Sequence, residues 1–153
     1  MGCVRRRAQT AVLRDATTTF EMYLEAALIE VLETQLGRRL ELPEKSPYWD
    51  DLKTAWKGLA GINLERHGVR AVRGRRNWLT HQRGQFRTDA QRAGHDTHEF
   101  GWPDPALRLT QASVANDMDT LAEAAASVDV EAYRLAGGGT SPPLARFSLR
   151  WRR

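Results

Sequence analysis

Residues 110–135 read TQASVANDMDTLAEAAASVDVEAYRL, and their apolar positions recur at alternating steps of four and three. This spacing puts the apolar side chains on one face of an α-helix that packs along a seam. The stripe consists of Val114, Met118, Leu121, Ala125, Val128, Ala132 and Leu135. Thr110 is predicted to cap this helix, because a threonine hydroxyl can accept a hydrogen bond from a backbone N–H of the first turn.

Three segments upstream also have helical apolar spacing, and none alternates with the period of two that is typical of strands. The first is predicted over residues 8–36 and ends at Gly37. The second follows Ser46 as its cap and ends at Gly61, and the third is predicted over residues 64–83. The sequence therefore predicts an all-α fold, an up-and-down bundle of four main helices with a long irregular loop before the last helix.

Length and composition narrow the class of protein. A chain of 153 residues, 41% of them hydrophobic, can bury roughly 70% of its unfolded surface around one core, so we predict a single helical domain over residues 1–135. Residues 136–153 are rich in Gly, Pro and Arg and are predicted to form a flexible basic tail. The sequence contains no membrane-spanning apolar run and has one cysteine, Cys3. We therefore expect a cytoplasmic protein without disulfides or membrane contact.

Basic charge is concentrated in one segment of the chain. The net charge is +4, but residues 63–92 carry eight basic and two acidic side chains, whereas residues 93–135 carry two basic and eight acidic ones. Clustered arginine is the electrostatic footprint of a phosphate-bearing partner such as nucleic acid. The alternative is a solvated, charged helix face.

Arg76 interrupts the apolar stripe of the third predicted helix, where Val69 and Val72 mark the inward face. An arginine is rarely buried without a partner, because the desolvation of a guanidinium group is unfavourable by several kcal/mol. Two explanations stay open. Either a carboxylate such as Glu21 or Glu25 pairs with Arg76, or Arg76 faces a cleft or subunit interface that receives an anion.

A polar patch follows from the same helix. Asn77 and His81 lie one turn apart on one face, with Arg76 beside them. On an ideal helix, Arg76 and His81 point about 140° apart, so one helix alone does not bring them together easily. A symmetric homodimer would collect two Arg76 and two His81 side chains in one cleft.

The string RRNWLTH, from Arg75 to His81, resembles the Arg-Asn-x-x-x-His signature of HEPN domains, which are named for nucleotide binding in higher eukaryotes and prokaryotes. The predicted order of helices is also similar, and the resemblance covers roughly residues 8–135. It implies an all-α, dimerising domain. Many HEPN domains are metal-independent endoribonucleases of toxin–antitoxin, phage-defence and RNA-processing systems.

The resemblance assigns Arg76, Asn77 and His81 as catalytic residues. His81 would act as general acid or base while the ribose 2′-oxygen attacks the adjacent phosphate, which leaves a 2′,3′-cyclic phosphate and a 5′-hydroxyl. Arg76 would stabilise the charge that develops on the phosphorane, and Asn77 would orient His81 or the phosphate. This chemistry needs neither a metal nor a cofactor.

Further arginines surround this motif. Several step along one face of the predicted helix toward Asn77, and we expect them to position an RNA backbone without reading its sequence. For each of them singly, a solubilising role is the alternative. The predicted RNA-binding residues are Arg66, Arg70, Arg73, Arg75 and Arg83.

Other features carry weaker signals. His95 and His98 could imitate metal ligands, but a polar surface loop is the preferred interpretation, and no metal site is predicted. Trp49 and Trp56 have core spacing and are expected to pack rather than stack on bases. Two other functions stay open: a non-catalytic HEPN-like module that binds nucleotide, RNA or a protein such as an antitoxin, and a structural helical adaptor.

Overall fold

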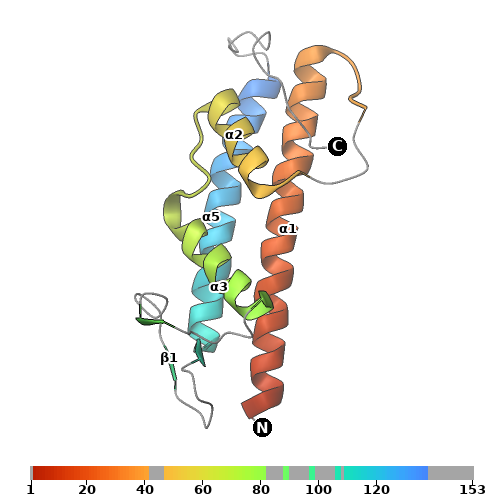
Figure 1. Cartoon of the computed structure of the whole chain (residues 1–153). Helices are drawn as coiled ribbons and strands as arrows, with labels where there is room; N and C mark the ends of the chain where they lie inside the picture. The colour runs from red at the N-terminus through yellow and green to blue at the C-terminus, as the bar shows by residue number, and fades with distance from the viewer. Residues whose placement is uncertain are drawn as a thin grey trace. The chain divides into compact units, whose positions relative to one another are not determined.

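The computed structural model describes residues 2–41, 47–81, 88–89, 97–98, 106–107 and 109–137. Its four α-helices are α1 (Gly2–Leu36), α2 (Trp49–Ala60), α3 (Val69–His81) and α5 (Gln111–Ala136), and the short 3₁₀ helix η1 (Arg66–Gly68) precedes α3 (Figure 1). Two short strands, β1 (Thr97–His98) and β2 (Ala106–Leu107), pair antiparallel. The predicted all-α class with four main helices is confirmed. Most of the predicted tail, residues 138–153, lies outside the described residues.

The chain divides into two compact units. The first comprises residues 1–18 and 68–121, and the second comprises residues 19–67 and 122–153. Helices α1 and α5 each contribute their N-terminal part to the first unit and their C-terminal part to the second. No helix within the described residues is long and apolar enough to cross a lipid bilayer.

In the first unit, α5 begins as predicted at Thr110. The Ser113 backbone N–H donates to Thr110 Oγ1 at 3.0 Å, and the Thr110 N–H donates to Ser113 Oγ at 2.9 Å, so each side chain caps a backbone donor of the other residue. Val69 and Val72 of α3 are almost completely buried, with Leu13 of α1 also in the core. The burial of Val69 and Val72 determines which face of α3 points outward.

In the second unit, the two tryptophans of α2 pack as predicted. Trp56 is fully buried, and its Nε1 donates to the backbone oxygen of Leu24 at 3.2 Å. The rings of Phe20 and Trp49 lie 6.5 Å apart at a tilt of 44°. Helix α2 ends at Gly61, whose φ of 69° is a left-handed conformation that favours glycine. Trp56 is therefore a core residue, and the half-buried Trp49 packs against Phe20.

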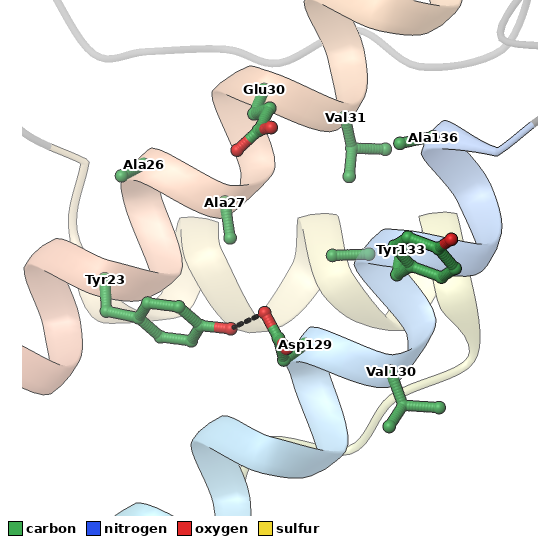
Figure 2. A pocket seen from close by; sticks show the side chains of 10 residues that line it. Tyr23, Ala26, Ala27, Glu30, Val31, Asp129, Val130, Tyr133 and Ala136 are labelled. Atoms are coloured by element: carbon green, nitrogen blue, oxygen red, sulfur yellow. Dashed lines mark hydrogen bonds between the residues drawn. The ribbon is translucent and has the colours of Figure 1, made fainter.

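The directions of the helices do not strictly alternate. In the second unit, Tyr23 of α1 contacts Asp129 of α5. Further toward the C-terminal ends of both helices, Val31 and Ala136 line the same pocket, so α1 and α5 run in parallel (Figure 2).

The alternation already fails between α1 and α2, because Trp49 lies beside Phe20 and Trp56 beside Leu24, so these two helices also advance in the same direction. Helices α3 and α5 are antiparallel, since Arg75 pairs with Asp117 and Gly68 lies near Thr120.

Two helix starts also differ from expectation. Helix α1 begins at Gly2 and is longer than the predicted 8–36. Helix α3 begins only at Val69, because Gly68 has a φ of 82° and interrupts the helical backbone after η1. Ser46, the predicted cap of α2, lies outside the described residues, and Tyr48 directly precedes the helix.

Candidate functional site

The candidate site lies on the outward face of α3. Burial of Val69 and Val72 turns the opposite side of the helix to solvent, where Arg70, Asn77 and His81 are exposed. His81 is the last residue of α3. The chain thus presents the polar part of the RRNWLTH string at the C-terminal end of one short helix.

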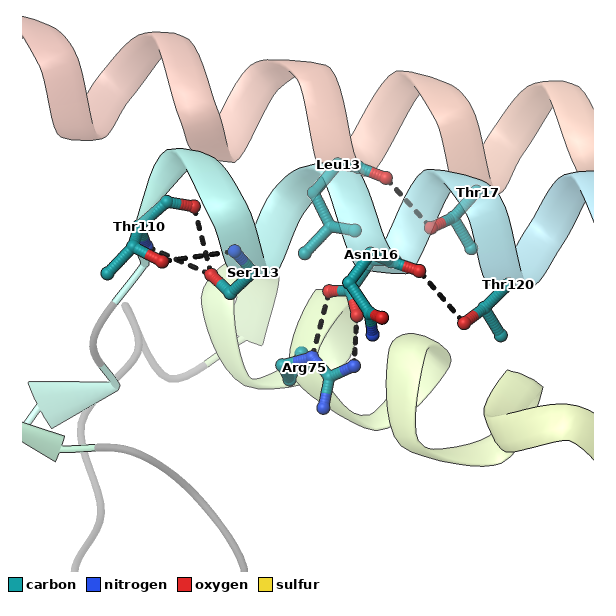
Figure 3. A network of polar contacts seen from close by, with 8 residues as sticks. Leu13, Thr17, Arg75, Thr110, Ser113, Asn116 and Thr120 are labelled. Carbon is teal, nitrogen blue, oxygen red and sulfur yellow. Dashed lines mark hydrogen bonds and ion pairs between the residues drawn. The ribbon is translucent and has the colours of Figure 1, made fainter.

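Arg75 points inward rather than toward this face. Its Nε donates to Asp117 Oδ2 at 2.9 Å, and its Nη2 donates to Asp117 Oδ1, which makes a bidentate ion pair between α3 and α5 (Figure 3). Asp117 is only 1% exposed. Because its guanidinium is paired with a buried carboxylate, the structure favours a role for Arg75 in packing α3 against α5 over the predicted contact with RNA.

Asp117 is a residue that the sequence interpretation missed. The predicted stripe of α5 assigned the inward position to Met118, which is 46% exposed, whereas Asp117 faces the core. The available signal was its spacing, three residues after Val114 and four before Leu121. One of the two open explanations for Arg76 was an ion pair with a carboxylate such as Glu21 or Glu25; the ion pair that the structure shows from this string joins Arg75 to Asp117 instead.

Arg76 is half-buried and has an incomplete set of partners. Its Nη1 donates to Asn77 Oδ1 at 3.0 Å. Its Nε is shielded from solvent and has no acceptor among the residues that the structure describes. An unsatisfied buried donor destabilises the free protein by about 1–3 kcal/mol, and an anion that reached it would relieve that penalty.

Asn77 and His81 complete the site. Both are exposed, and because four residues separate them they share a face of α3. Thr80, between them, turns its hydroxyl back to the carbonyl oxygen of Arg76 at 2.9 Å. A guanidinium, an amide and an imidazole are thus presented within about one and a half turns of helix, which is the functional-group set for phosphate binding with proton transfer.

The other predicted RNA-binding arginines do not form one continuous stripe. Arg70 is exposed on α3, and Arg73 is half-buried and has a partner of its own within the chain. Arg66 lies in η1, before the break at Gly68, and belongs to the second unit. Arg83 lies outside the described residues.

His95 and His98 resemble metal ligands in the sequence, although no metal site is predicted. Across the described part of the chain, no group of three or more His, Cys, Asp or Glu side chains is placed to hold a metal ion. His95 lies outside the described residues, and His98 contributes backbone pairing to β1.

In comparisons with known proteins, no family model matches the chain, and neither a curated protein nor a solved structure matches it significantly. The likeness to HEPN domains therefore depends on the RRNWLTH string and on the order of the helices.

Proposed function

We propose that this protein is a metal-independent endoribonuclease of HEPN type that acts as a homodimer. The observation that carries the proposal is the state of Arg76: a half-buried guanidinium with an unsatisfied Nε, bonded to Asn77 and followed by the exposed His81. A neighbouring arginine has a carboxylate partner, whereas Arg76 keeps donor capacity for a ligand. Phosphate oxygens match that capacity in charge and geometry.

The reaction follows from these groups. One His81 imidazole accepts the proton of the ribose 2′-hydroxyl, and the 2′-oxygen forms a bond to the adjacent phosphorus. The bond from phosphorus to the 5′-oxygen breaks, and the leaving oxygen takes up a proton, which the protonated His81 of the second subunit supplies. Arg76 stabilises the equatorial oxygens during the step, and Asn77 orients the phosphate. The products are a 2′,3′-cyclic phosphate and a 5′-hydroxyl.

The homodimer is part of this proposal for a geometric reason. His81 lies five positions after Arg76, so on one helix their side chains diverge by about 140°. If the exposed faces of two α3 helices cross at a two-fold axis, the arginine of one subunit lies near the histidine of the other. Arg70, exposed on the same helix, is then placed to contact the RNA backbone beside the cleft.

Four variants test the catalytic assignment. Arg76→Ala, His81→Ala and Asn77→Ala are compared with wild type on bulk RNA in the presence of a chelator, with Thr80→Ala as the matched control on the same exposed face. We expect losses of about 100-fold or more for Arg76→Ala and His81→Ala, and cyclic phosphate ends from the wild type. Loss of RNA cleavage by Thr80→Ala alone, or 3′-hydroxyl ends, would contradict the assignment.

A mixture of variants tests the shared site. Arg76→Ala and His81→Ala subunits are each expected to be inactive alone. Mixed dimers retain one Arg76 and one His81 on opposite subunits, and water then supplies the proton of the leaving oxygen, so co-refolding the two variants restores a small part of the activity if the cleft is composite. Activity that never recovers, although mixed dimers form, would place the two residues in separate sites.

The same experiments separate the alternative functions. If the wild type retains RNA but never cleaves it, the protein is a non-catalytic HEPN-like binding module. If it has no affinity for RNA, a structural adaptor is favoured. As the physiological setting we propose the cytoplasm, in toxin–antitoxin or phage-defence systems, with an antitoxin as the possible protein partner.

A further inference from the structure

A groove lies in the second unit between α1 and α5, among residues that the proposed ribonuclease does not use. It has a volume of about 490 Å³ (Figure 2). Tyr23 closes one end, where its hydroxyl donates to Asp129 Oδ1 at 3.1 Å and approaches the carbonyl oxygen of Ala125 at 3.4 Å. Alanines from both helices line much of the rest, so the two backbones leave room for larger side chains.

The rim of this groove combines exposed apolar groups with negative charge. Val130 is 67% exposed and Tyr133 is 82% exposed. Glu30 and Asp129 stand at the edge as exposed carboxylates. Large exposed apolar side chains beside acidic groups indicate a surface for a segment that is apolar and basic together.

The chain contains one segment of this chemistry in its tail. Residues 144–152 read LARFSLRWR, and from Ala145 onward apolar residues at odd positions alternate with serine or arginine at even ones. In an extended backbone this alternation puts phenylalanine, leucine and tryptophan on one side and arginines on the other. These residues lie outside the described part of the chain.

The covalent connection favours this segment over a separate partner. The groove extends to Ala136, and residues 138–143 lead from there to the segment. Six residues can span up to roughly 20 Å, whereas the groove from Asp129 to Ala136 is about 10 Å long at the helical rise. Tethering also raises the effective concentration of the segment to about the millimolar range, which supports docking that is weak for a free peptide.

We propose that the groove between α1 and α5 is a docking site for residues 144–152 of the same chain. The apolar side chains of the segment cover Val130 and Tyr133, and its arginines neutralise Glu30 and Asp129. This inference is independent of the ribonuclease activity.

Trypsin tests the docking in the full chain, because it cleaves after arginine. The rates of cleavage after Arg146 and Arg150 are compared between wild type, the double variant Val130→Asn/Tyr133→Ser, and Glu30→Gln. Glu123→Gln is the matched control, since Glu123 is an exposed acid of α5 that does not line the groove. Hydrogen exchange is also measured over residues 129–136, in wild type and in Phe147→Ser/Trp151→Ser.

Docking predicts that the double variant is cleaved about tenfold faster than wild type, that Glu30→Gln is cleaved faster by a smaller factor, and that Glu123→Gln is unchanged. Exchange in α5 should quicken when Phe147 and Trp151 are replaced. The protection should not depend on protein concentration. Equal cleavage rates in wild type and groove variants would overturn the proposal. Protection from trypsin that increases with protein concentration would also overturn the proposal, because it would mean that the tail of another copy of the chain occupies the groove.

Discussion

The α3 face of the first unit and the α1–α5 groove of the second carry charge of opposite sign that is unpaired in the described part of the chain. On α3, one arginine is neutralised internally by Asp117, while Arg76 next to it retains an unsatisfied donor and Arg70 is exposed. In the groove, Glu30 and Asp129 are exposed beside apolar groups. The first surface suits an anion and the second a basic apolar segment. The comparison teaches that the two proposed sites coincide with the places where charge is least matched within the described residues.

The largest expected effect is on the buried ion pair. Asp117→Ala leaves Arg75 without its partner in a mostly buried site, so we expect the free energy of unfolding to fall by about 3–5 kcal/mol. Urea denaturation measures this. The double variant Arg75→Met/Asp117→Leu removes both charges and should recover most of the loss. If Asp117→Ala costs less than 1 kcal/mol, the pair does not hold α3 to α5.

The next effect contrasts two neighbouring arginines. Arg75→Met strands the Asp117 carboxylate and should destabilise the protein by several kcal/mol, whereas Arg76→Met should change stability by no more than about 1 kcal/mol, because Arg76 has no carboxylate partner among the described residues. Thermal or urea unfolding of both variants makes the comparison. Equal losses would mean that Arg76 is a structural residue as well.

These two arginines also show which features of the structure can be predicted from the sequence and which cannot. The apolar stripes predict four helices and the packing of the tryptophans of α2, because the helical period of apolar residues is a local property of the chain. The sequence does not show which arginine pairs with a carboxylate, because Arg75 and Arg76 differ by 100° around the helix and only the packing against α5 brings Arg75 to Asp117. A positive φ at Gly68 likewise separates Arg66 from α3, which no apolar spacing reports.

A smaller effect concerns RNA affinity. Arg70 is exposed on α3, so Arg70→Ala should weaken RNA binding similarly for all sequences and reduce the slope of log affinity against log salt by about one. Filter binding or fluorescence anisotropy at several salt concentrations measures the slope. The matched control is Arg134→Ala, an exposed arginine of α5 paired with Glu131, which should leave the slope unchanged.

The smallest effect is a titration in the groove. Burial, followed by the hydrogen bond to Asp129, raises the pKa of Tyr23 from 10.0 to about 12. Since the folded pKa is the higher one, this stabilisation is complete below pH 10 and is lost as pH rises toward 12. Ultraviolet titration should show one tyrosine ionising late, and Tyr23→Phe should remove it. A late tyrosine that persists in Tyr23→Phe would contradict the hydrogen bond.

The central claim is that Arg76 binds the RNA phosphate, whereas Arg75 stabilises the fold through its ion pair with Asp117. The most direct test is the single-turnover rate of RNA cleavage, measured in a chelator, for wild type and Arg76→Ala at matched fractions of folded protein. The account predicts a rate about 100-fold lower for Arg76→Ala, with unfolding midpoints that nearly coincide. Equal rates, or a loss that only follows a drop in stability, would contradict it.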